Sequence, residues 1–119
     1  MPYVDGFVLP VPKKNLTAYK KISKMAGKIW KEFGALEYRE CAADDMNAPM
    51  GIPFPKLVKP KAGEIVVFSW ILYKSKADRN KINAKVMKDP RIANMCDPKK
   101  TPFDHNRMAM GGFKTIVDM

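Results

Sequence analysis

Three residues of this sequence have the side chains best suited to catalysis or polar binding. Asp5 lies within an apolar segment, where a carboxylate is either exposed to solvent or buried with a partner. Arg39 could bind an anion through two parallel hydrogen bonds, and His105 could act as a general base if its loop covers a pocket. Asp5, Arg39 and His105 are therefore the candidate catalytic residues. Tyr38 and Trp70 are the candidate ligand-binding residues, because aromatic rings commonly line pockets.

Each candidate also has a structural interpretation. Asp5 could form an ion pair between strands, with Lys114 or Arg107 as the expected partner. Arg39 could be a solvated residue of an edge strand, and the aromatic residues could be core or dimer packing. His105 is the only histidine and has no Cys, Asp or Glu at metal-ligand spacing, so the sequence predicts no metal site. No pattern in the sequence indicates a bound cofactor.

The hydrophobic pattern predicts the elements that position these residues. Apolar runs with β-branched and aromatic residues predict strands, and apolar residues three and four apart predict helices. The expected strands are residues 3–9, 35–43, 64–73 and 108–117, and the expected helices are residues 13–33 and a segment from Ser75 to just before Pro90. Right-handed crossovers turn this β-α-β-β-α-β order into a ferredoxin-like α+β fold. We expect a four-stranded antiparallel sheet with both helices on one face and the first and third strands at its centre.

Two segments lack a regular hydrophobic period. Residues 44–63 contain several prolines and form a Pro-rich arm, which is expected to be a lid, an interface, or a cover for one face of the sheet. Residues 90–106 are expected to be irregular. The chain of 119 residues fits one domain, residues 1–119, with the arm as part of it.

Composition restricts the class of protein. Hydrophobic residues make up 46% and charged residues 29%, which is typical of a soluble globular protein. No apolar run reaches the ~20 residues that a membrane-spanning helix needs, and the N-terminus lacks the pattern of a signal peptide. Cys41 and Cys96 are expected to be free thiols. We therefore expect a cytoplasmic protein.

The expected sheet has more apolar surface than two helices can cover. The strand at residues 64–73 places large apolar side chains on both of its sides: Val66, Phe68, Trp70 and Leu72 on one, and Ile65, Val67 and Ile71 on the other. Monomers seldom expose an apolar patch of several hundred Å². The sequence therefore predicts a homodimer in which two sheets pack face to face and pair as an α/β barrel.

Several blocks of the sequence resemble the YbaA-like family of small bacterial proteins: residues 3–8, 34–41, 68–70, 83–87 and 111–114. That family is similar to the dimeric α/β-barrel superfamily, so the resemblance implies a pair of ferredoxin-like units. The family has no established function and supplies no catalytic residues. The wider superfamily includes cofactor-free monooxygenases, haem-handling enzymes, isomerases and ligand-binding regulators, and a shared fold does not choose among them.

Two functional hypotheses follow from the sequence. The first is a small-molecule-binding protein, or an enzyme of the cofactor-free monooxygenase or isomerase type, with a pocket inside the barrel and the arm as a lid. The second is a non-catalytic basic module that binds nucleic acid or a protein through its helices, since the net charge is +10. The lysines lie on the expected helices and the aromatic residues on the sheet. This separation suits nucleic acid poorly, so only weak electrostatic binding to it is expected.

Overall fold

The computed structural model describes residues 1–47, 49–95, 97 and 101–119. Its elements are β1 (Tyr3–Pro12), η1 (Lys13–Asn15), α1 (Leu16–Glu32), β2 (Glu37–Ala42), α2 (Phe54–Val58), β3 (Glu64–Tyr73), α3 (Lys76–Lys88), α4 (Pro90–Met95), η2 (His105–Arg107) and β4 (Ala109–Lys114). The four strands form one sheet in the order β2-β3-β1-β4, and every pair of neighbours is antiparallel. The predicted ferredoxin-like fold, with the first and third strands at the centre, is confirmed.

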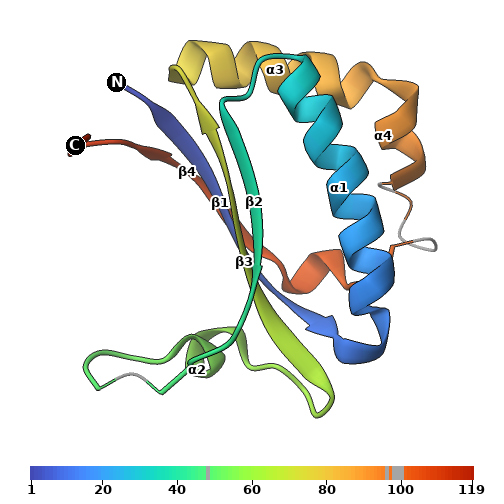
Figure 1. Cartoon of the computed structure of the whole chain (residues 1–119), viewed down its shortest axis with the longest axis vertical. Helices are drawn as coiled ribbons and strands as arrows, with labels where there is room; N and C mark the ends of the chain where they lie inside the picture. Colours follow the sequence, from blue (N-terminus) through green and yellow to red (C-terminus); the bar gives the residue numbers. More distant parts are fainter. Residues whose placement is uncertain (48, 96, 98–100) are drawn as a thin grey trace.

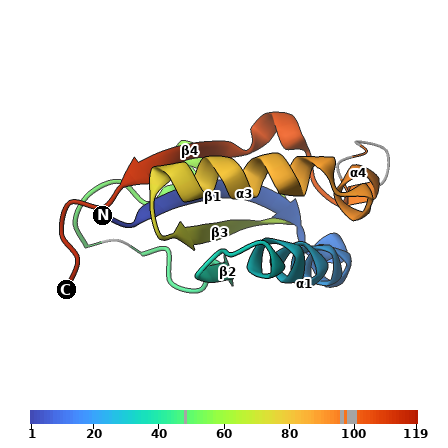
Figure 2. The same cartoon turned by 90° about the horizontal axis from the view of Figure 1, so that it is seen from above.

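The helices α1 and α3 lie on one face of this sheet (Figures 1 and 2). We call this face the inner face and the opposite one the outer face. α1 ends before Gly34, whose φ of +118° suits a residue without a side chain. α3 begins at a cap in which the Ser75 hydroxyl accepts a hydrogen bond from the Asp78 backbone N–H at 3.1 Å.

β1 extends further than its sequence suggests, because its prolines face the free side of the strand. β4 pairs with β1 only as far as Val8. The backbone N–H of Lys13 donates a hydrogen bond to the Gly63 carbonyl, and the N–H groups along a strand point to alternate sides. The nitrogens of Pro10 and Pro12 therefore point away from β3. No ladder hydrogen bond is lost at either residue.

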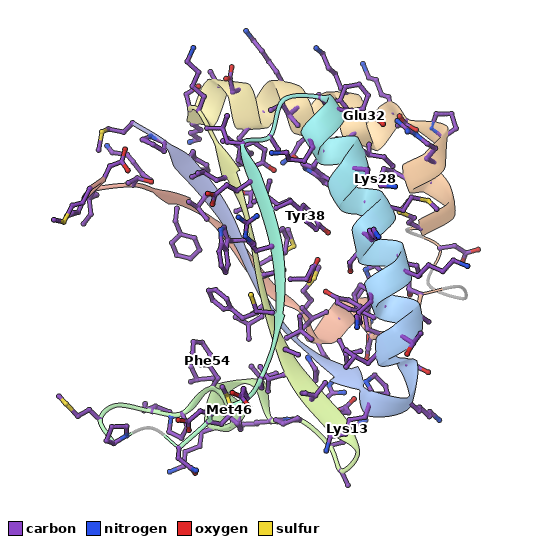
Figure 3. All side chains as sticks on the ribbon, in the orientation of Figure 1. Lys13, Lys28, Glu32, Tyr38, Met46 and Phe54 are labelled. Carbon is purple, nitrogen blue, oxygen red and sulfur yellow. The ribbon has the colours of Figure 1, made fainter. Side chains whose placement is uncertain are left out.

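The two segments without a hydrophobic period contain short helices. α4 starts at Pro90, a position where the missing N–H of proline has no helical partner to lose. α2 lies in the Pro-rich arm and contacts β1 and β3. The arm extends away from α1 and α3, and the Phe54 ring lies 6.0 Å from the Phe68 ring on the outer face (Figures 1 and 3). It therefore covers one end of the outer face and is not placed over the helices.

In the described part of the chain, no helix combines the length and apolar character needed to span a membrane. The buried core lies between the inner face and the helices, in two groups around Ile71 and Leu9. Both groups are closed by helical residues, among them Ile29, Val86 and Tyr19.

Candidate functional site

A cavity of about 340 Å³ lies between the inner face of the sheet and the helices. Its walls come from all four strands, from α1, α3 and α4, and from the segment that contains η2. Most of its lining is apolar, including Phe7, Leu9, Ile22, Ala26, Ile71, Met87, Ile92, Met95, Phe103 and Met108. Against this apolar wall stand three sets of polar groups, which we describe in turn.

The first set is a tyrosine–glutamate cluster formed by Tyr19, Tyr38 and Glu40. The Tyr19 hydroxyl donates to Glu40 Oε1 at 2.7 Å, and the Tyr38 hydroxyl donates to Glu40 Oε2 at 2.9 Å. Tyr19 comes from α1, while Tyr38 and Glu40 alternate along β2 and so share the inner face. Figure 3 shows Tyr38 extending from β2 toward α1. Both oxygens of one carboxylate are thus held by phenols in the cavity wall.

Burial and the neighbouring carboxylate determine the protonation of these tyrosines. Burial is the main cause that raises the pKa of Tyr19 and of Tyr38 well above the ordinary phenol value, and the negative charge of Glu40 raises both further. The phenols therefore remain neutral donors. Gly27 of α1 makes room for this arrangement, because a Cβ at that position would lie 2.8 Å from Tyr38 Cδ1.

The second set is the Asp5 network, on the two central strands and α3. Asp5 is buried, and its Oδ1 lies 3.5 Å from Arg79 Nε. Arg79 also donates to the Tyr3 hydroxyl at 3.0 Å, with its guanidinium carbon 4.9 Å from the centre of the Tyr3 ring. The expectation that Lys114 or Arg107 would pair with Asp5 is wrong. The partner comes from α3 because Asp5 faces the helices.

Asn83 completes the Asp5 network. Its Oδ1 accepts hydrogen bonds from Trp30 Nε1 at 3.0 Å and from the Tyr73 hydroxyl at 3.2 Å, and its Nδ2 donates to Asp5 Oδ2 at 3.4 Å. Burial, followed by the charge of Asp5, raises the pKa of Tyr73 above the ordinary phenol value. One amide thus links α1, β3, α3 and β1 through a single chain of hydrogen bonds.

The third polar group is His105, in η2. Its ring lies 4.6 Å from the Phe103 ring, and both residues line the cavity. Its Nε2 is buried and has no hydrogen-bond partner among the residues that the structure describes. Buried ring nitrogens are normally paired, so this atom has an unused capacity for a polar group of a ligand.

The structure brings some of the sequence candidates together and separates others. Asp5, Tyr38 and His105 line the cavity. Arg39 is exposed on the outer side of β2, opposite Trp70 in the ladder; it does not line the cavity, but it is among the residues that line the groove between α1 and β2. Trp70 borders the cavity, but its ring packs 5.7 Å from Phe68 on the outer face. The aromatic residues therefore do not form one wall.

A wide groove between α1 and β2 leads to the cavity. It has a volume of about 980 Å³ and shares four residues with the cavity, namely Tyr19, Ser23, Tyr38 and Glu40. Within the described part of the chain, no three His, Cys, Asp or Glu side chains gather as a metal site would require. Cys41 is an exposed free thiol, and Cys96 lies outside the described residues.

Sequence reasoning missed four residues of this site: Tyr19, Glu40, Arg79 and Asn83. Glu40 could have been found from the sequence, because it lies two positions after Tyr38 on the same strand and so shares its face. Tyr19 could also have been found, as a polar-tipped aromatic on the apolar stripe of α1. Arg79 and Asn83 lie one turn apart on α3 among lysines, and nothing local distinguishes them from solvated residues.

Comparisons with known proteins agree with this fold. The chain is 44% identical over 118 residues to “Uncharacterized protein YbaA” of Escherichia coli strain K12, with 99% of both chains covered. A solved structure of Rv0793 from Mycobacterium tuberculosis has a TM-score of 0.59 at 12% identity and covers 99% of this chain and 98% of its own. An uncharacterized NIPSNAP domain protein from Burkholderia xenovorans has a TM-score of 0.59 at 14% identity, over 97% of this chain and 95% of its own.

A dimeric ferredoxin-like protein from an uncultured marine organism has a TM-score of 0.56 at 13% identity and covers both chains fully. At these identities the structural likeness shows the fold alone. Residues 2–105 match the family described as “Protein of unknown function (DUF1428)”. This match spans most of the sequence, and the similarity to YbaA agrees with it. The chain therefore belongs to this family of unknown function.

Proposed function

We propose that the protein binds an apolar small molecule in the cavity between the inner face and the helices, and that it does so as a homodimer. The observation that carries this proposal is an apolar cavity into which a small number of polar groups converge. Ligand sites commonly have this composition, in which apolar walls supply affinity and a few polar groups fix orientation. The volume of about 340 Å³ lies at the lower end of the usual range of roughly 300–1,000 Å³.

The polar groups differ in what they can offer a ligand. Both oxygens of Glu40 already accept hydrogen bonds from phenols, and Asp5 is held by Arg79 and Asn83. His105 Nε2 is buried and unpaired in the described part of the chain. We therefore place the polar end of the bound molecule at His105, with its apolar body against the methionine and phenylalanine side chains.

A second copy of the chain is the proposed occupant of the outer face. Val4, Val8, Phe68, Trp70 and Phe113 lie around a hollow of about 660 Å³ on that face. Phe68 is 42% exposed and Phe113 is 62% exposed, although the arm already covers part of the surface with Phe54. Burying such rings is worth about 25 cal/mol per Å². The dimeric neighbour of the same fold supports a second copy as the partner.

The cavity is tested by filling it from α1. Ser23 is buried on the cavity wall and Thr17 is exposed on the same helix, so Ser23→Phe and Thr17→Phe form a matched pair. Aromatic acids and quinones are screened by thermal shift.

A ligand at a hundred times its Kd adds about 2.7 kcal/mol to the free energy of unfolding, which raises Tm on the order of 10 °C at this chain length. Ser23→Phe should abolish the shift and Thr17→Phe should retain it; a shift retained by a folded Ser23→Phe variant contradicts the cavity.

The dimer is tested by sedimentation. The double variant Phe68→Lys with Phe113→Lys should sediment as a monomer at concentrations where the unchanged protein is a dimer. Met25→Lys is the control, because Met25 is 48% exposed on α1 and borders neither the outer hollow nor the cavity. A monomeric unchanged protein, with its outer face in water, would contradict the proposed assembly.

A further inference from the structure

We infer that the bound molecule is an anion, with its charged group held by the lysines of α1 at the mouth of the groove. This inference rests on the proposed function, because the apolar body of the same molecule would enter the cavity. It names the class of ligand as a largely apolar molecule with one anionic group, such as a carboxylate, at the end opposite to the polar group placed at His105.

The mouth of the groove carries a row of positive charge. Lys20, Lys24 and Lys28 follow one another at intervals of four residues, so they lie on one side of α1, and all three are exposed lining residues of the groove. Figure 3 shows Lys28 on the helix that forms this wall. Lys31 lines the same groove but is engaged, since its Nζ donates to the Leu36 carbonyl at 2.7 Å.

The acidic residues of the groove are already engaged elsewhere. Glu40 accepts from two phenols, and Glu32 is bound by Arg91 at 2.9 Å. The pKa of Glu32 is lowered chiefly by its hydrogen bond with Arg91 and only to a smaller degree by Lys28. In the described part of the chain, every ion pair within 4.0 Å uses an arginine. Lys20, Lys24 and Lys28 therefore leave an uncompensated positive charge at the groove.

The apolar part of the groove lining is suited to an apolar body. It contains Leu16, Gly27, Ala42 and Val67, and it is continuous with the cavity through Tyr19, Ser23 and Tyr38. An apolar molecule that lies along this path places one end beside the lysine row and the other among the cavity side chains. Charge outside and apolar surface inside are the complement of an amphiphilic anion.

A second lysine row in the molecule provides the comparison that makes this inference specific. Lys81, Lys85 and Lys88 are exposed on α3, also at helical spacing, but none of them lines the cavity or the groove. General attraction of anions by the net charge of +10 would depend on both rows equally. Recognition of an anion bound in the groove would depend on the α1 row, which lines the groove together with Arg39, and not on the α3 row.

A pair of charge-reversed variants tests this difference. The probe is 11-(dansylamino)undecanoic acid, measured by fluorescence titration against its uncharged methyl ester at low and high salt. The variants are Lys24→Glu with Lys28→Glu on α1 and Lys81→Glu with Lys85→Glu on α3, which change the net charge by the same amount. Circular dichroism confirms that both variants fold.

We expect the unchanged protein to bind the acid about tenfold more tightly than the ester, equivalent to about 1.4 kcal/mol, with the difference shrinking at high salt. The α1 variant should lose this preference, while the α3 variant should keep it. Equal affinity for acid and ester, or an equal loss in both variants, would overturn the inference. If Ser23→Phe still abolishes binding of the ester, the proposed cavity stands without the anion. Binding of neither probe by the folded protein would overturn both proposals.

Discussion

The inner and outer faces of the sheet differ in the polar side chains that they carry. On the inner face, β1 and β3 carry Asp5 and Ser69 among apolar residues, and the polar atoms of Asp5 are bound by Arg79 and Asn83. On the outer face, the same two strands present Val4, Val8, Phe68 and Trp70. The side-chain alternation of a strand makes this division residue by residue.

This difference separates two kinds of role. An apolar face needs only a matching apolar surface, which a second copy can supply. A buried carboxylate must be satisfied by specific partners and is retained at a cost in desolvation. The inner face holds Asp5 and Glu40 in this way, each with its oxygens bound by neighbouring side chains, and both carboxylates form part of the cavity wall.

The largest expected effect comes from the tyrosines of the inner face at alkaline pH. The pKa values of Tyr19, Tyr38 and Tyr73 in the folded protein are raised, chiefly by burial. Above about pH 10 the unfolded chain loses phenol protons that the folded protein keeps. Stability from these groups is thus complete below pH 10 and decreases above it, by about 1.4 kcal/mol per pH unit for each tyrosine.

Urea unfolding at a series of pH values measures this slope, and absorbance at 295 nm follows ionisation in the folded state. Tyr38→Phe is the matched change, and it should reduce the slope by the contribution of one phenol. Ionisation of all three inner tyrosines near pH 10 in the folded protein would contradict the expected direction.

The next effect compares one apolar truncation on each face of β3. Ile71 is 4% exposed on the inner face, and Phe68 is 42% exposed on the outer face. Ile71→Ala should lower the free energy of unfolding by about 3 kcal/mol, within the usual range of 2–5 for buried aliphatic residues. Phe68→Ala should lower it by less than about 1 kcal/mol when the protein is dilute and monomeric. Equal losses in urea unfolding would remove the distinction between the faces.

The sequence predicted the fold well because its signals are local. Apolar alternation in residues 64–73 and helical spacing before Gly34 determine elements whose bounds agree with β3 and α1 within a few residues. Pro90 misled the prediction of an irregular segment, since proline ends one helix and can begin another. The arm was recognised as a distinct segment, but its contact with the outer face depends on tertiary packing.

The site was less predictable because it depends on partners that are distant in the sequence. Arg79 is 74 positions after Asp5, and the sequence instead suggested Lys114, on the strand adjacent to β1, or Arg107, just before that strand, as the cation. The side of the sheet that Asp5 faces decides between them. Arg107 instead binds Glu64 at 2.7 Å, near the far end of β3. The alternation of side chains along a strand could show that Tyr38 and Glu40 share one face of the sheet. It could not show which face the helices cover.

A smaller effect is expected from breaking the Asp5 network. Asp5→Ala removes the carboxylate near Arg79 and leaves the guanidinium with Tyr3 as its remaining described partner. Loss of one member of a buried pair costs about 3–5 kcal/mol, but the Arg79 side chain is 24% exposed, so we expect about 2 kcal/mol. A double-mutant cycle with Arg79→Ala separates the pair from its surroundings. A coupling energy near zero would show that the two residues are stabilised independently.

The smallest effect tests whether the cavity wall depends on close packing. Gly27→Ala places a methyl group 2.8 Å from Tyr38 Cδ1, so the ring or α1 must move. Alanine favours the helix by about 1 kcal/mol relative to glycine, whereas overpacking costs about 1–3 kcal/mol. The net loss of stability should therefore lie between about 0 and 2 kcal/mol. Binding of the dansyl probe should weaken through displacement of Tyr38. Ala18→Gly, at an exposed position of the same helix, is the control for helix propensity, since it should lower stability without affecting the probe. If Gly27→Ala leaves both the probe affinity and the Tyr38 environment unchanged, the tyrosine–glutamate cluster is not part of the binding wall.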